Sequence, residues 1–117
     1  MTDIVVTWPK SRTLDSYLEE LERAVDLGLE INFRVSSFPK QKVDRCFVVH
    51  DGAVRGWNRI LRLEWIADKK VSRVRNDSWA GFWPAGYYIV RDPEWHSIEP
   101  VPMKGFQGWR YYGDSAS

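Results

Sequence analysis

The chain has 117 residues, with 17 basic and 16 acidic side chains, one cysteine and seven tryptophans. This length predicts a single domain over residues 1–117, with a core large enough to fold without disulfides. The lone Cys46 excludes an internal disulfide, and the sequence has neither a basic-then-apolar leader nor an apolar run of membrane length. We therefore expect a cytoplasmic protein that does not span a membrane.

Charge is distributed unevenly along the chain. Residues 1–30 carry three basic and seven acidic side chains, whereas residues 31–75 carry eleven basic and four acidic ones. A basic central stretch is typical of a protein that presents a cationic face to a polyanion. It is equally compatible with an ordinary solvated surface that a neighbouring acidic helix balances.

The first part of the chain predicts a strand followed by a helix. The segment DIVVTW (3–8) is typical of a short strand, which Pro9 ends. Apolar residues then recur at helical spacing, at Leu14, Leu18, Leu21 and Val25. This pattern predicts one amphipathic helix, with Ser11 or Thr13 as its N-terminal cap and Gly28 at its end. Its other face is acidic, so we expect the helix to cover one side of a sheet.

The rest of the chain predicts β structure. Strand patterns cover residues 30–37, 86–92 and 108–112, and a hairpin covers 45–67 with its turn at His50-Asp51-Gly52. On the outgoing strand, strict alternation places Arg55, Trp57 and Arg59 on one face and Val54 and Ile60 on the other. The adjacent apolar residues Ile60 and Leu61 predict a bulge or bend near Asn58.

The other segments predict less regular structure. We expect residues 67–85 to form an exposed loop that contains a short strand, residues 93–105 to be extended, and residues 114–117 to be a frayed tail. Taken together, the elements predict an α+β domain, namely a small, mostly antiparallel β-barrel with one main N-terminal helix.

Few side chains point to catalysis or to metal binding. His50 and His96 are 46 positions apart and, with one cysteine, give no metal-ligand spacing. The glycine-rich nucleotide motifs are missing as well, so we expect no cofactor and no metal. Glu64 is a candidate general acid or base, or alternatively a rim carboxylate that pairs with a neighbouring arginine.

Aromatic and basic residues alternate in three short stretches, TWPKSR, VRGWNR and MKGFQGWR. Stacking planes beside fixed cations suit single-stranded or flipped bases, although each stretch alone is also compatible with packing at the rim of a core. The candidate ligand-binding residues are Trp8, Lys10, Arg12, Arg55, Trp57, Arg59, Lys104, Gln107 and Trp109. The proline-rich and aromatic segment at residues 100–112 leaves two interpretations of Trp109, which either lines this site or seals the core.

Two stretches resemble ASCH and related PUA-like domains. Residues 51–65 (DGAVRGWNRILRLEW) are similar to the central strand of that family, and residues 98–112 (IEPVPMKGFQGWRYY) are similar to its closing segment. The matching positions are Gly52, Ala53, Gly56, Pro100 or Pro102, Lys104, Gly105, Gly108 and Trp109. The resemblance covers about a quarter of the chain. It implies a PUA-like β-barrel with a cleft for a nucleotide base or RNA, including modified bases.

Three hypotheses for function follow. The first is a nucleic-acid-binding module for RNA or a modified base. The second is a small hydrolase or amidohydrolase acting on a modified nucleoside or RNA, with Lys10, Thr13 and Glu64 as candidate catalytic residues. Lys10 and Thr13 have a spacing similar to that of amidohydrolase members, but residues 29–44 lack the lysine-rich signature of many ASCH domains, which favours binding over catalysis. The third is a protein-interaction or host-modulating factor with exposed aromatic residues.

Overall fold

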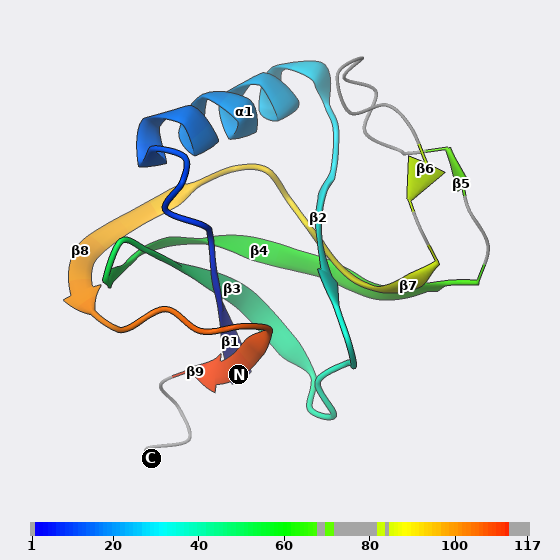
Figure 1. Ribbon diagram of the computed structural model, residues 1–117. Helices are drawn as coiled ribbons and strands as arrows, with labels where there is room; N and C mark the ends of the chain where they lie inside the picture. Colours follow the sequence, from blue (N-terminus) through cyan, green and yellow to red (C-terminus); the bar gives the residue numbers. More distant parts are fainter. Residues whose placement is uncertain (1, 68–69, 72–81, 84, 113–117) are drawn as a thin grey trace.

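The computed structural model describes residues 2–67, 70–71, 82–83 and 85–112, in which one helix lies against a sheet (Figure 1). The elements in chain order are β1 (Thr2–Thr7), α1 (Leu14–Leu27), β2 (Ile31–Val35), β3 (Val43–His50), β4 (Ala53–Ile66), β5 (Lys70–Val71), β6 (Phe82–Trp83), β7 (Gly86–Arg91), β8 (His96–Pro102) and β9 (Trp109–Tyr112). The α+β class is therefore confirmed. In the described part of the chain, no helix is long and apolar enough to cross a membrane.

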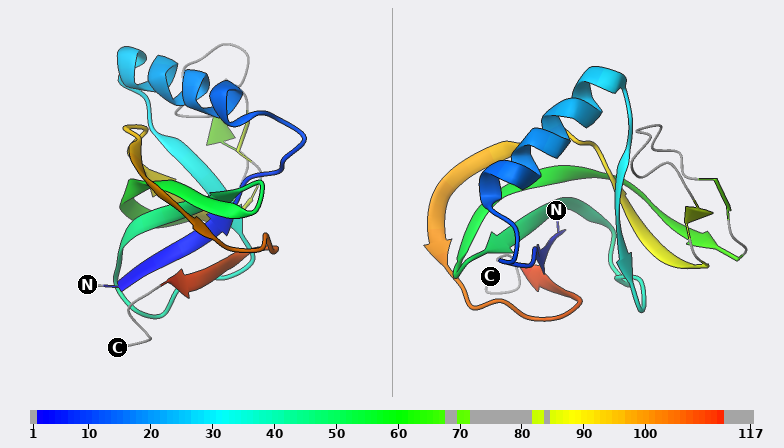
Figure 2. Two further views of the ribbon diagram at one scale, coloured as in Figure 1. Left: turned by 90° about the vertical axis from the view of Figure 1, so that its left-hand side faces the viewer. Right: turned by 45° about the horizontal axis from the view of Figure 1, so that its top comes forward.

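The main sheet is mixed and open. Its strands follow the order β2-β7-β4-β3-β1-β9, and β8 pairs with β4 outside this path. β1 is parallel to β3, whereas the other pairs are antiparallel. The curved β4 pairs with β3 and β8 along its first half and with β7 along its second half (Figure 2). Among the described strands the ladder ends at β2 and β9 and does not close, so the expected barrel is not confirmed.

Side chains connect the two ends of this open sheet. The indole Nε1–H of Trp109 on β9 donates to the carbonyl oxygen of Ser37, just after β2, at 2.9 Å. The Tyr111 hydroxyl accepts hydrogen bonds from the backbone N–H groups of Lys40 and Gln41 at 2.9 and 3.3 Å. The β2–β3 connection is therefore held against β9 without a strand ladder.

Strand β4 is irregular on both sides of Asn58, where a bend was expected. In the β3 ladder Val48 faces Gly56 while Val49 faces Val54, which leaves Arg55 as an extra residue. In the β7 ladder the irregularity lies between Ile60 and Arg62. Because the first bulge reverses the alternation, Val54 lies in the apolar cluster against which Trp57 packs. Its predicted placement on the face opposite Trp57 was wrong.

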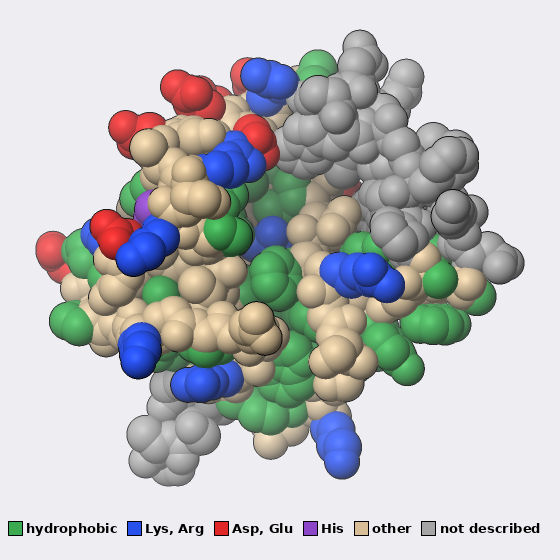
Figure 3. Space-filling view, in the orientation of Figure 1, with side chains coloured by type: hydrophobic (Ala, Val, Ile, Leu, Met, Phe, Trp, Pro, Cys, Tyr) green, Lys and Arg blue, Asp and Glu red, His purple; other side chains and the backbone are tan. Residues whose placement is uncertain are grey.

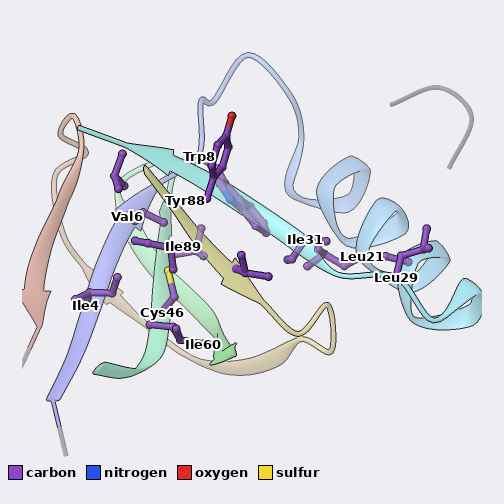
Figure 4. Packing of buried hydrophobic residues seen from close by; sticks show 14 of the residues in the cluster. Ile4, Val6, Trp8, Leu21, Leu29, Ile31, Cys46, Ile60, Tyr88 and Ile89 are labelled. Atoms are coloured by element: carbon purple, nitrogen blue, oxygen red, sulfur yellow. The ribbon is translucent and has the colours of Figure 1, made fainter. Parts of the chain in front are cut away.

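Helix α1 begins and ends at predicted residues. The backbone N–H of Ser16 donates to the Thr13 hydroxyl at 3.1 Å, and Gly28 ends the helix at φ 68°. Leu21 and Ala24 are buried against the sheet, as Figure 4 shows for Leu21. Val25 was expected on this apolar stripe but is 47% exposed. The buried face of the helix instead runs from Leu21 to Ala24, which is three residues later. Val25 therefore lies at the edge of this buried face.

Two apolar layers flank the sheet. The larger layer includes Ile4, Val6, Cys46 and Ile89, which lie among the strands of the curved sheet, and Leu21 of α1 belongs to the same layer (Figure 4). Cys46 is 0% exposed, which confirms its predicted place in the core. The smaller layer contains Val5, Phe47, Val49 and Val54, against which Met103 and Phe106 of the β8–β9 connection pack.

Two further segment predictions have different outcomes. The extended segment at residues 93–105 contains β8, whose Pro100 and Pro102 lie on a strand that pairs with β4 alone. The loop expected at residues 67–85 and the tail expected at 114–117 lie largely or wholly outside the described residues, apart from the short strands β5 and β6.

Candidate functional site

Four of the predicted basic residues meet where β1 leads into α1. A cavity of about 420 Å³ is lined by Lys10 and Lys104, among others, and a second of about 410 Å³ is lined by Lys10, Arg12 and Arg55. The two cavities share Lys10 and Asp51. We call Lys10, Arg12, Arg55 and Lys104 the junction surface. Figure 3 shows Lys and Arg side chains on this side of the molecule, beside the β3–β4 turn and the β8–β9 connection.

Backbone contacts bring these distant segments together. The N–H of Trp8 donates to the Val49 carbonyl oxygen at 2.9 Å, which fixes the end of β1 beside β3. The N–H of Met103 donates to the Gly52 carbonyl oxygen at 3.0 Å, so the closing segment lies against the β3–β4 turn. That turn is tight because Asp51 and Gly52 both have positive φ, at 51° and 83°.

The cations of the junction surface differ in how they are paired. Within the described part of the chain, Lys10 and Lys104 form no ion pair. Arg12 is paired with Glu20. Arg55 donates from Nε to the His50 carbonyl oxygen at 2.9 Å and from Nη2 to that of Asp51 at 3.2 Å. The two lysines are therefore the cations best placed to pair with an external anion.

The sequence reading missed the structural role of His50. The buried His50 Nε2 lies 2.8 Å from the carbonyl oxygen of Arg12, and since a carbonyl only accepts, this nitrogen carries the hydrogen. The hydrogen bond connects the end of β3 to the segment before α1, and therefore positions Arg12. A histidine beside an Asp-Gly turn gave no signal beyond turn chemistry.

The predicted stacking residues Trp8 and Trp57 are both used within the fold. Trp8 is 6% exposed and stacks on Tyr17 and Trp95, with ring centroids 4.4 and 5.4 Å apart. Trp57 stacks on His96 at 4.0 Å, and the Arg45 guanidinium lies 5.2 Å from its ring centroid. Trp8 therefore has no ring face available to a base.

Three other predicted residues lie away from the junction surface. Arg59 is paired with Asp44 at 3.8 Å on the exposed side of β3 and β4. Gln107 lines a separate cavity of about 750 Å³ with Arg34 and others. Trp109 is partly buried and packs against the main core, with the hydrogen bond to Ser37 described above. The nine predicted residues therefore do not share one cleft.

The candidate hydrolase residues are not assembled either. Lys10 and Thr13 line the same cavity, but the Thr13 hydroxyl caps α1. Glu64 lies on the second half of β4, where its carboxylate accepts a hydrogen bond from Arg62 Nε at 3.2 Å. Among the residues that the structure describes, no three His, Cys, Asp or Glu side chains are grouped so as to hold a metal ion.

Arg91 is the residue that sequence analysis missed most clearly. It is 3% exposed at the end of β7 and lines a cavity of about 240 Å³ beneath α1. Its Nη1 lies 3.3 Å from Asn58 Oδ1 and its Nη2 lies 3.4 Å from the Asn32 carbonyl oxygen, while Nε has no hydrogen-bond partner among the described residues. Burial lowers the pKa of this guanidinium and raises the pKa of the neighbouring Cys46 thiol. In sequence, an arginine that ends a strand is typical of an exposed rim.

Comparison with known proteins gives no family for this chain. No protein-family model matches it, and neither does any curated protein or solved structure. Function is therefore inferred from the residues and from their geometry.

Proposed function

We propose that this chain binds single-stranded nucleic acid, RNA or a strand with a modified base, through the junction surface. The observation that carries this proposal is the convergence of Lys10, Arg12, Arg55 and Lys104, from three separate stretches, on two adjoining cavities. Several cations at fixed positions are what a strand of phosphates requires, because each neutralised phosphate releases counterions.

The unequal pairing of these cations supports separate roles. Lys10 and Lys104, without ion pairs among the described residues, hold phosphate groups by charge. The N-terminus of α1 lies beside Lys10, and its helix dipole favours an anion there. Asp51, shared by both cavities, opposes anion binding and limits how closely a phosphate approaches the turn.

The placement of the aromatic residues changes the expected mode of recognition. Since Trp8 is buried and Trp57 is stacked on His96, backbone phosphate contacts contribute more than base stacking in this proposal. Phosphate contacts position a strand but carry no direct sequence information. We therefore expect strong salt dependence and weak sequence preference.

We also propose that the fold is a PUA-like arrangement of the ASCH type, in a cytoplasmic protein. The close approach at Gly56 supports this, because a Cβ atom added there would lie 2.4 Å from the His96 carbonyl oxygen and 2.4 Å from Trp95 Cζ2. Gly56 is one of the positions on which the resemblance was based. The curvature of β4 also agrees with it.

Fluorescence anisotropy tests the proposed function. Labelled single-stranded RNA and DNA oligonucleotides of mixed sequence are titrated with protein at several salt concentrations. Each phosphate contact to a single strand contributes about 0.7 to the slope of log affinity against log salt, so two to four contacts give roughly 1.4–2.8. No binding at low salt would refute the proposal, and turnover of free nucleosides would favour a hydrolase.

A further inference from the structure

The buried arginine beneath α1 has no balancing carboxylate in the part of the chain that the structure describes. Among the described residues, the ion pairs involve Asp3, Glu20, Asp44, Glu30 and Glu64, and none of them is made with Arg91. The polar neighbours of Arg91 are neutral: Asn58 Oδ1 at 3.3 Å, the Asn32 carbonyl oxygen at 3.4 Å, and the Cys46 thiol, which burial keeps protonated by raising its pKa. Its Nε is buried and makes no hydrogen bond with any residue that the structure describes.

This arrangement is costly for the protein alone. An arginine keeps its proton under nearly all conditions, so burial does not remove the charge by deprotonation. A buried charge without a hydrogen-bonded partner of opposite sign destabilises a fold by several kcal/mol. An anion that binds beside Arg91 is stabilised by the guanidinium charge. Folding has already removed water from this guanidinium, so binding does not have to pay that desolvation cost again.

The cavity next to Arg91 combines apolar walls with a few polar groups, as small-ligand sites do. Its volume is about 240 Å³, and its apolar walls are Trp8, Leu21 and Ile31. Figure 4 shows these three residues between α1 and the sheet, and Figure 3 shows a hollow beneath the helix with a basic side chain visible inside it. For comparison, an apolar cavity of about 150 Å³ in another protein holds benzene.

The polar groups at this cavity favour one kind of anion. Glu20 also lines it, and although its carboxylate is paired with Arg12, it disfavours a second group of high negative charge. A doubly charged phosphate is therefore less suited than a carboxylate with one charge. The apolar walls favour a carboxylate attached to a hydrophobic body over a fully hydrated inorganic ion.

We propose that the cavity beneath α1 binds a small organic carboxylate, with its carboxylate group facing Arg91 and its apolar body against Trp8, Leu21 and Ile31. This inference goes beyond nucleic-acid binding, because Arg91 lines neither cavity of the junction surface. Among the described residues, Trp8 is the one lining residue that the cavity beneath α1 shares with the cavity of Lys10 and Lys104. Because the cations differ, Arg91 in one site and Lys10 and Lys104 in the other, a benzoate test and an oligonucleotide test distinguish failure of one proposal from failure of the other.

Thermal unfolding with matched probes tests the proposal. Benzoate is compared with benzamide, which has the same ring but no charge, and with inorganic phosphate at equal ionic strength. At about ten times its dissociation constant, benzoate is expected to raise the melting temperature by roughly 4–8 °C, in a saturable manner. Benzamide and phosphate are expected to leave it unchanged. An equal rise with either of them, or no rise with benzoate, overturns the proposal.

Two arginine variants show whether the effect depends on the buried guanidinium. Arg91→Met is expected to abolish the benzoate effect, whereas Arg59→Met, on an exposed arginine of β4, is expected to keep it. A benzoate effect that persists in Arg91→Met contradicts the proposal. If Arg91→Met does not fold, the Nε–H resonance of Arg91 in the unaltered protein decides. It must shift with benzoate and not with benzamide, and a resonance that does not shift overturns the inference.

Discussion

The indole of Trp8 stacks on the phenol ring of Tyr17, with ring centroids 4.4 Å apart and planes inclined by 25°. This contact joins the segment after β1 to the first turn of α1. The Tyr17 hydroxyl also donates to the Pro9 carbonyl oxygen at 3.0 Å, and the Arg12 guanidinium lies 4.3 Å from the centre of the Tyr17 ring. The pair therefore fixes the polypeptide that carries Lys10 and Arg12.

Removal of the Trp8 ring tests this structural role. Trp8→Ala is expected to lower the free energy of unfolding by about 3–5 kcal/mol, since a buried aromatic ring is lost and a cavity remains. Trp65→Ala provides the matched control, because Trp65 is 53% exposed and its loss should cost roughly 1 kcal/mol. Urea unfolding followed by circular dichroism measures both. Equal costs at the two positions would contradict this assignment.

Loss of phosphate contacts tests the junction surface. Lys10→Ala and Lys104→Ala are each expected to weaken oligonucleotide binding and to reduce the magnitude of the salt slope by about 0.7, without lowering stability. Lys42→Ala is the control, because this exposed lysine lies between β2 and β3 and lines neither cavity. Anisotropy titrations at several salt concentrations give affinity and slope together. Slopes unchanged in both variants, or reduced equally in Lys42→Ala, would argue against the proposed surface.

Local patterns predicted the elements of this fold better than they predicted the site. The helix was found because apolar residues recur every three or four positions between Thr13 and Gly28, and because both caps are chemically distinctive. The turn at Asp51 and Gly52 was found for the same reason. Such signals depend only on residues close in sequence, so tertiary contacts elsewhere in the chain do not change them.

The site depends on contacts between distant segments, which no local pattern encodes. A tryptophan at the end of a strand, such as Trp8, is equally compatible with a stacking platform and with a buried position under a helix. Arg91 likewise resembles an exposed strand end in sequence, but tertiary packing buries it beside Asn58 of β4 and Asn32 of β2. The convergence of Lys10 and Lys104 was predicted from their aromatic neighbours, yet those neighbours pack into the core or against other side chains instead.

The role of Trp109 distinguishes the two interpretations of the closing segment. Because its Nε1–H donates to Ser37, Trp109→Phe is expected to lower the free energy of unfolding by about 0.5–1.5 kcal/mol through the lost hydrogen bond. Oligonucleotide affinity is expected to stay the same, since this ring holds β9 against the β2–β3 connection. Chemical denaturation and anisotropy on the same preparation measure both quantities. A loss of affinity without a loss of stability would restore Trp109 as a binding residue.

Cys46 provides a test of core integrity. Burial raises the pKa of this thiol, so the reactive thiolate is scarce in the folded protein near neutral pH. We expect an aromatic disulfide reagent to modify Cys46 far more slowly in the native protein than in the protein unfolded in urea. Absorbance after mixing gives both rates. Rapid modification of the native protein would show that the core around Cys46 opens readily.

The packing around Gly56 connects the central strand to the Trp8 pair. Trp95 lies directly over Gly56, where an added Cβ atom would be 2.4 Å from Trp95 Cζ2, and Trp95 in turn stacks on Trp8. Gly56→Ala is therefore expected to displace Trp95 and the backbone at His96, at a cost of about 1–3 kcal/mol or more.

A second glycine gives the comparison that makes this prediction specific. At Gly105 an added Cβ atom would lie 3.1 Å from Thr7 Cγ2, a side-chain methyl group that can shift by a few tenths of an ångström. Gly105→Ala is thus expected to cost less than Gly56→Ala when both are measured by urea unfolding with similar m-values. Near-ultraviolet circular dichroism should also change for Gly56→Ala, because the Trp95–Trp8 stack is disturbed. If Gly56→Ala is as stable as the unaltered protein and its aromatic spectrum is unchanged, the placement of the Trp95 ring directly against Gly56 is contradicted.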